Sequence, residues 1–241
     1  MAPAACAHRL IFRRMIFGNN EVRRSLSFRK VRQVYQTLLG RDTVQPPYHH
    51  ICQAGDPVLR ACASPVDPEI TTEKVFQKLL DHMKAVMRHY NAVGLAAPQV
   101  GVSLQIFMAE LTEKQLKYYD SDTIRVREMK PFPLQVFINP TLKVRDYSVL
   151  KFPEGCESIR GFDAEVSRSR AVTVSGLDAN GKPVTWEAVG WAARIAQHEM
   201  DHLRGALYVE KMDPSTFTCT AWQKINENHG RMELRYYNRK V

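Results

Sequence analysis

The fold is organised around one stretch of sequence, Gln197-His198-Glu199-Met200-Asp201-His202-Leu203. On an α-helix, residues four apart lie on nearly one face, separated by about 5.4 Å along the axis. His198 and His202 can therefore hold one metal ion, and Glu199, a quarter-turn round the helix, would face water or substrate on that ion. The spacing indicates metal-assisted hydrolysis.

The turns before this stretch, residues 192–196, are mostly small and apolar, which predicts a buried helix. Two histidines, a glutamate and an aspartate are costly to bury without a partner such as a metal ion. The motif is short enough to occur by chance, however, and the histidines of a half-buried helix can simply be hydrogen-bonded to the protein. The metal interpretation therefore needs a third ligand.

Hydrolytic metal sites usually hold three protein ligands and one open position. The pattern that places a third histidine six residues after the second fails here, because Tyr208 occupies that position. Glu227 remains an alternative ligand further along the chain. Cys156 is the stronger candidate, since it lies in a non-helical, glycine-containing segment beside Glu154 and Glu157, although a lone cysteine is more often a small core residue.

Apolar periodicity divides the rest of the chain into helices and strands. A core-facing helix is expected over 72–90, and Asp178-Ala179-Asn180-Gly181 predicts a hairpin between two strands. Gly190 would open the helix of the two histidines, and Gly205 would end it. Further expected elements are strands over 104–110, 134–139, 141–150, 171–177 and 183–189, a loop or edge strand over 93–101, a surface excursion over 112–130, a break over 151–158, a short strand over 207–209 and a last helix over 213–229.

The strands and helices do not alternate as in a parallel β-α-β fold, so the expected fold class is α+β. We expect a single compact domain of mixed or antiparallel sheets packed around the helix of His198 and His202, with a C-terminal helix. A chain of 241 residues, 44% apolar and 24% charged, suffices for one such domain and a tail.

The net charge of +9 is concentrated near the N-terminus. Residues 1–41 contain nine lysines and arginines and one acidic residue, so they carry +8 and the remainder carries +1. An amphipathic, arginine-rich and acid-poor segment with serines is typical of an organellar transit peptide, whereas a disordered basic tail is the alternative. We expect residues 1–45 to be a transit peptide and residues 46–241 to be the catalytic domain.

Five scattered cysteines without a C-x-x-C pair do not predict a disulfide framework, so a reducing compartment is expected. No run of eighteen apolar residues occurs, which predicts a soluble protein without a membrane span. Because the charge after the leader is nearly neutral, no stable nucleic-acid binding is expected.

Three motifs resemble those of the peptide deformylases, in that family's order: Gly94-Leu95-Ala96-Ala97-Pro98-Gln99, Glu154-Gly155-Cys156-Glu157-Ser158, and the stretch that contains His198 and His202. The acidic residue after Cys156, together with the basic leader, resembles the mitochondrial branch. The resemblance implies removal of the formyl group from the N-formylmethionine of nascent chains in the mitochondrial matrix. It also implies one divalent metal ion bound by Cys156, His198 and His202.

The resemblance further implies the role of each residue near the metal. Metal-bound hydroxide would attack the formyl carbon, and Glu199 would pass the proton to the leaving amine. The side-chain amide of Gln99 and the backbone N–H of Glu157 would stabilise the oxyanion. Asp201 and Arg168 would orient the ligands, unless they form only a surface salt bridge.

The peptide, by the same resemblance, would lie extended along Val93-Gly94 and Gly155 like an added strand. Its methionine side chain would enter an apolar pocket, whose expected residues are Val93, Trp191 and Ile195, with Arg194 near the mouth. The helical spacing of Trp191, Ile195 and His198 is consistent with one shared face.

Two other functions remain open. A zinc endopeptidase would share the histidine motif but cleave internal amide bonds and use a downstream third ligand. A non-enzymatic, metal-stabilised module would dock on the mitochondrial ribosome through the last helix and a basic tail, Arg231, Arg235, Arg239 and Lys240. The ligand set suits Fe(II), Zn(II) or Co(II), with Fe(II) favoured, and a monomer or homodimer is expected.

Overall fold

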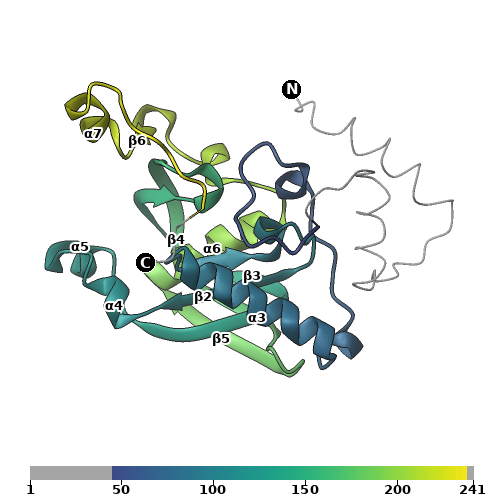
Figure 1. Ribbon diagram of the computed structural model, residues 1–241. Coiled ribbons are helices and arrows are strands. Elements are labelled where there is room, and N and C mark those ends of the chain that lie inside the picture. The colour runs from purple at the N-terminus through teal and green to yellow at the C-terminus, as the bar shows by residue number, and fades with distance from the viewer. Residues whose placement is uncertain (1–44, 238–241) are drawn as a thin grey trace, which may run out of the picture.

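The computed structural model describes residues 45–237 (Figure 1). Nearly all of the expected transit peptide, and the basic residues Arg239 and Lys240, therefore lie outside the described residues. No helix in the described range is long and apolar enough to cross a membrane.

Strand β2 (Ile106–Leu111) shows how the layers of the molecule are arranged. Successive side chains of a strand point to opposite faces of its sheet. Ile106 and Met108 pack with helix α3 (Lys74–His89), whereas Phe107 packs with helix α6 (Trp191–Leu203). The sheet is therefore covered by α3, which crosses in front of it in Figure 1, and by α6 on its other face.

The sheet in the described part of the chain is antiparallel, with the strand order β1-β2-β3-β4-β5 and with β6 paired to β4. The strands are β1 (Gly94–Ala96), β3 (Phe132–Gly155), β4 (Phe162–Leu177), β5 (Pro183–Val189) and β6 (Thr218–Cys219). Together with α6 and a C-terminal helix, α7 (Trp222–Glu227), this confirms the expected α+β class. The end of β3 places Cys156 beside α6.

Several elements agree with the sequence pattern. Helix α3, strand β5 and the hairpin turn lie where expected, and α6 lies between Gly190 and Gly205, whose φ angles of 59° and 75° favour glycine. Strand β4 ends as expected at Leu177 but begins at Phe162, nine residues before the expected strand over 171–177. Single turns of 3₁₀ helix connect the larger elements: η2 (Pro57–Arg60), η3 (Pro68–Ile70), η4 (Ala97–Val100), η5 (Glu157–Ile159), η6 (Tyr208–Glu210) and η7 (Pro214–Thr216).

Strand β3 corrects the largest expectation, because one strand of 24 residues replaces two strands and a break. Pro140 was expected to separate the strands, since proline cannot donate a ladder hydrogen bond. The register between β3 and β4 shifts around Pro140, and it shifts twice more before Val149, so the strand continues through local irregularities.

Three other ranges also differ from expectation. Residues 112–130 contain two short helices, α4 (Glu113–Leu116) and α5 (Ser121–Val126), whose few turns give no periodic signal. The expected strand at 207–209 is the η6 turn. The expected helix over 213–229 is broken into η7, β6 and α7, because Asp213 caps only one 3₁₀ turn by accepting from the N–H of Ser215.

Candidate metal centre and active site

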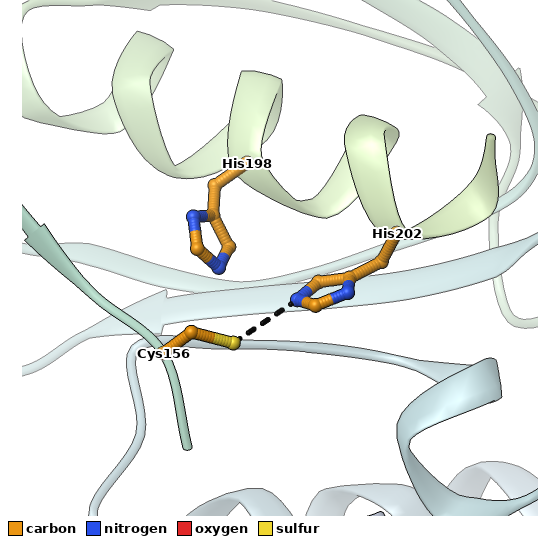
Figure 2. Close-up of side chains that lie close together, drawn as sticks. All are labelled: Cys156, His198 and His202. Atoms are coloured by element: carbon orange, nitrogen blue, oxygen red, sulfur yellow. Dashed lines mark hydrogen bonds between the residues drawn. The ribbon is translucent and has the colours of Figure 1, made fainter. Parts of the chain in front are cut away.

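Three side chains that can bind a metal ion converge between α6 and the end of β3 (Figure 2). His198 and His202 project from successive turns of α6, with ring centroids 5.0 Å apart. Cys156 approaches them from the segment after β3, and its Sγ is 3.3 Å from Nε2 of His202. The three ligand atoms lie within 4.8 Å of one another. Glu227, the alternative third ligand, lies on α7 and is not part of this group.

The donor chemistry of this group fits a divalent transition metal, because one thiolate and two imidazoles are typical ligands of such ions. In addition, Oε2 of Glu199 is buried and has no hydrogen-bond partner among the described residues. A buried carboxylate oxygen without a partner is costly, so its position beside the ligand group is explained by a ligand that it faces.

Glu154 holds His198 in place, a role that the sequence did not assign to it. Its Oε2 lies 3.1 Å from Nδ1 of His198. The other ring nitrogen of His198 points toward Cys156 and His202 in Figure 2. Arg168 donates two hydrogen bonds of 2.9 Å to this carboxylate, and Arg194 donates one of 2.7 Å. Burial alone would raise the pKa of Glu154, but Arg168 and His198 hold it well below its usual range.

Arg168 links this carboxylate to α6. Its Nη1 donates to Oδ2 of Asp201 at 2.6 Å, and the other oxygen of Asp201 accepts from Nζ of Lys211 at 2.5 Å. The side chains of Glu154, Arg168, Arg194 and Asp201 are each 4% exposed, and we call these four residues the buried charge network. Arg168 and Asp201 therefore form a buried pair and not a surface salt bridge.

Arg194, expected near the mouth of the methionine pocket, lies inside the buried charge network. Besides Glu154, its guanidinium donates to the backbone carbonyls of Leu150, Phe152 and Val166. Its cation also lies 5.4 Å from the ring centroid of Phe152. Arg194 thus ties α6 to β3 and β4.

The two ligand histidines differ electrostatically. Burial by itself would lower the pKa of His198, but contacts with Cys156 and Glu154 raise it well above its ordinary value. Burial, reinforced by the charge on His198, lowers the pKa of His202 well below its ordinary value. His202 is therefore held as a neutral imidazole, the form that binds metals.

Glu199 lies against β1. A Cβ atom added at Gly94 would overlap the carboxylate of Glu199, so any larger residue at position 94 would displace that carboxylate. Burial raises the pKa of Glu199 to about 7, although the charge on His198 opposes this effect. A carboxylate with a pKa near neutrality can both accept and release a proton at physiological pH.

Gln99 presents its amide N–H groups to the ligand site from η4. Its Oε1 accepts from the backbone N–H of Ala96 at 2.9 Å, which fixes the orientation of the amide. Nε2 then donates to Oγ of Ser158 at 3.2 Å and lies 3.7 Å from Sγ of Cys156. The N–H of Ser158 also donates to this sulfur, at 3.4 Å. Ser158 is a second contributor that the sequence left without a role, although it closes the motif that contains Cys156.

The expected pocket residues pack in one apolar cluster. Trp191 and Ile195 are buried in it on the face of α6 that continues from His198, and Val93 packs against them. Arg127, from the segment after α5, also lies against this cluster, with its guanidinium 5.1 Å from the ring centroid of Trp191. The sequence pattern did not identify Arg127, because residues 112–130 carry no periodicity that predicts where they pack.

Gly155 and Glu157 lie on either side of Cys156. Gly155 is exposed at the end of β3, opposite Asp163 of β4. The backbone carbonyl of Glu157 accepts from the side-chain amide of Gln53 at 2.8 Å, and its carboxylate lies 3.5 Å from Nε of Arg160. These contacts fix the backbone around the cysteine.

Residues 48–217 match the polypeptide deformylase family. The chain is 50% identical to the mitochondrial peptide deformylase of Homo sapiens over 183 residues, and this matched region is 76% of this chain and 75% of the human protein. It is 46% identical over 180 residues to the chloroplastic/mitochondrial peptide deformylase 1A of Arabidopsis thaliana, covering 74% of this chain and 66% of that one. A Met-Ala-Ser-bound crystal structure of the class I type b enzyme from Acinetobacter baumannii superposes with a TM-score of 0.60 and 28% identity, over 71% of this chain and 100% of the other.

The fold, the Cys-His-His group and these similarities agree with one another, and the family match covers more than half of the chain. The chain therefore belongs to the polypeptide deformylase family, whose members are metal-dependent hydrolases of formylated peptides.

Proposed function

We propose that this protein hydrolyses the formyl group from N-formylmethionine at the start of newly made mitochondrial polypeptides, with one divalent metal ion bound by Cys156, His198 and His202. The observation that carries the proposal is the convergence of this ligand group with two further side chains. Glu199, whose pKa is about 7, and the fixed amide of Gln99 both lie beside it.

A divalent ion in this position supplies Lewis acidity towards water and the formyl oxygen when it is bound. Glu199 accepts a proton from the attacking water as the new C–O bond forms at the formyl carbon. It then gives that proton to the methionine nitrogen as the C–N bond breaks, so that formate and a free amine leave. Burial, which raises the pKa of Glu199 to about 7, suits the carboxylate to both transfers.

Gln99 and the backbone N–H of Glu157 stabilise the negative charge that develops on the formyl oxygen. Because Ala96 fixes the amide of Gln99, its donors need no reorientation during the reaction. The buried charge network holds His198 through Glu154, and so Arg168 and Asp201 act on the site by positioning a ligand.

The substrate backbone pairs with Val93 and Gly94, at the start of β1, on one side and with Gly155 on the other. Strand β1 stands at the end of the strand order, so its outer edge can accept a further extended chain. The methionine side chain enters the cluster of Val93, Trp191 and Ile195, while Arg194 supports that pocket from behind.

Formate release tests this function directly. A protein consisting of residues 46–241, loaded with Fe(II), should release formate from a formyl-Met tripeptide and leave an acetyl-Met tripeptide intact. Fe(II) is proposed as the native ion, and Zn(II) and Co(II) serve as comparisons after removal of metal with a chelator. New amino termini from internal cleavage, without formate, would instead favour the endopeptidase. Metal binding with neither product would favour the ribosome-docking module.

We propose that residues 1–45 are a mitochondrial transit peptide and that residues 46–241 work in the matrix. The basic composition of residues 1–41 supports this, as do the organellar names of the human and Arabidopsis relatives. Residues 1–45 fused to a fluorescent protein should accumulate in mitochondria, whereas a diffuse cytosolic signal would refute the assignment. Matrix location is then read from protease protection in isolated mitochondria.

A further inference from the structure

The C-terminal tail, residues 231–237, returns from α7 to the end of α3 (Figure 1). The hydroxyl of Tyr90 donates to the backbone carbonyl of Tyr236 at 2.7 Å. The ring of Tyr237 lies 4.8 Å from the ring of His89. His89 and Tyr90 come just before residues 91–94, so the tail is fixed next to the segment that leads into β1.

The tail also contacts the segment that follows Cys156. Leu234 packs next to Gly161, where an added Cβ would lie 3.5 Å from its Cδ1. The guanidinium of Arg160 lies 5.7 Å from the ring centroid of Tyr90, so the two segments approach each other beneath the tail. The tail therefore spans from the residues just before 91–94 to the segment after Cys156, next to one end of the proposed peptide groove.

That end is where a bound peptide must leave the site. A chain that pairs with Gly94 cannot continue along residues 95–100, because all of them are buried. It can continue only past residues 91–93, which are partly or fully exposed. Residues 91–93 form a short turn, because the N–H groups of Asn91 and Ala92 donate back to the carbonyls of Arg88 and Met87 at the end of α3. An extended substrate of about three residues, at roughly 3.3 Å each, is long enough to pass such a turn. The next residues of the substrate then reach Tyr90 and the tail.

The side chains of the tail at this exit are apolar and accessible. Leu234, Tyr236 and Tyr237 are 46%, 52% and 48% exposed, within four consecutive residues. Grouped exposed apolar side chains mark contact surfaces more often than single ones do. Here they continue the proposed peptide groove, which identifies the downstream part of the substrate as the occupant.

We propose that Leu234, Tyr236 and Tyr237 form a contact surface for the substrate beyond its third residue, so that the enzyme binds nascent chains more tightly than formylated tripeptides. This inference rests on the proposed function and on the direction of the bound peptide given above. It assigns the tail to substrate selection and leaves the chemical step to the residues around Cys156.

The test compares two substrates with the same first three residues, a formyl-Met tripeptide and a formyl-Met nonapeptide with apolar residues after the third. In the protein of residues 46–241, the triple variant Leu234→Ser, Tyr236→Ser and Tyr237→Ser should raise KM for the nonapeptide about fivefold. A change of this size corresponds to the loss of a few half-buried apolar contacts. Its kcat, and its kcat/KM for the tripeptide, should stay within twofold of the parent. Tyr90→Phe, which removes the O–H that holds the carbonyl of Tyr236, should act in the same direction.

Tyr147→Ser is the matched control, because Tyr147 is 80% exposed on β3, eight residues before Gly155, and should affect neither substrate. Equal effects on both substrates, or none on the nonapeptide, would overturn the proposal. A lower molar mass in analytical ultracentrifugation for the triple variant than for the parent would overturn it too, because the tail would then form a contact between two copies of the chain. If the parent releases no formate from the tripeptide, the proposed function itself fails.

Discussion

Helices α3 and α6 cover opposite faces of the same sheet but bury different chemistry. The buried side chains of α3 are all apolar: Phe76, Leu79, Leu80, Met83, Val86 and Met87. Helix α6 buries Arg194, Glu199, Asp201 and His202 among its apolar residues. The buried face of α3 is stabilised by apolar packing, whereas the buried polar groups of α6 need specific partners.

The partners of α6 come from elements far away in sequence. Glu154 on β3 and Arg168 on β4 meet the charges of the helix, and Cys156 completes the ligand group. Burying ion pairs adds little net stability, because the cost of removing charges from water offsets their attraction. Helix α3 therefore serves the stability of the fold, while α6 gives up stability to hold polar side chains in a fixed arrangement.

The largest expected effect tests the functional side of the comparison. Glu199→Gln should lower kcat by about 100- to 10,000-fold, because the amide cannot accept the proton. Metal content should be unchanged, and the metal-free variant should be more stable than the parent at pH 8. Burial raises the pKa of Glu199 to about 7, so the protonated side chain stabilises the fold below its unfolded pKa, and this contribution is lost as the pH rises through 7. At pH 8 the parent therefore buries a charged carboxylate, which the amide of the variant avoids. Turnover above a tenth of the parent value would contradict the assigned role.

Glu154→Gln should disturb both stability and metal binding. The variant leaves Arg168 and Arg194 buried without their carboxylate, which should lower the free energy of unfolding by about 3–5 kcal/mol. Affinity for metal should fall about 10- to 100-fold, since Glu154 orients His198. Urea unfolding and chelator competition measure the two quantities.

Glu165→Gln is the matched control for this change, because Glu165 pairs with Lys151 on the surface, with side chains 39% and 44% exposed. Its effect on unfolding should stay below about 1 kcal/mol. If Glu165→Gln lowered the free energy of unfolding as much as Glu154→Gln does, burial of the network would not explain the effect of Glu154→Gln.

Met83→Ala tests the other helix. Met83 is fully buried on α3, so the cavity should lower the free energy of unfolding by about 2–5 kcal/mol. The kcat of the folded enzyme should not change, because α3 contributes no group to the ligand site. A parallel loss of kcat would show that the two faces of the sheet are coupled.

The smallest effect is a dependence on pH. The pKa of Glu154 is depressed by Arg168 and His198 against the effect of burial, so its stabilisation is present above the unfolded pKa of about 4.5 and is lost as the pH falls below it. The stability gap between the parent and Glu154→Gln should therefore narrow between pH 5 and pH 3. Urea midpoints of the metal-free proteins measure it, and a constant gap would argue against the depressed pKa.

The parts of the fold that were predicted from the sequence have local causes. Two histidines four residues apart share a helix face, and glycines at both ends set the limits of α6. Cys156 was proposed from its non-helical, glycine-containing segment, whereas Gln99 was identified only through the resemblance to the peptide deformylases. The α+β class followed from the order of helical and strand patterns.

What the sequence did not reveal depends on contacts between distant segments. The role of Glu154 requires β3, β4 and α6 to meet, and the burial of Arg194 follows from the same crossing. Strand β3 was divided in error, because irregular register around Pro140 looks like a break in the pattern. The short helices in 112–130 are held by side-chain caps, which periodicity does not detect.

The length of β3 has a consequence for the order of assembly. Cys156 directly follows this strand, and His202 lies 46 residues later, after the whole β4–β5 hairpin. A growing chain therefore exposes the thiol well before the imidazoles that complete the Cys-His-His group. Closing so long a loop is slow compared with forming helices or hairpins. Metal loading is thus expected to come late, as a step that reports complete folding of the domain.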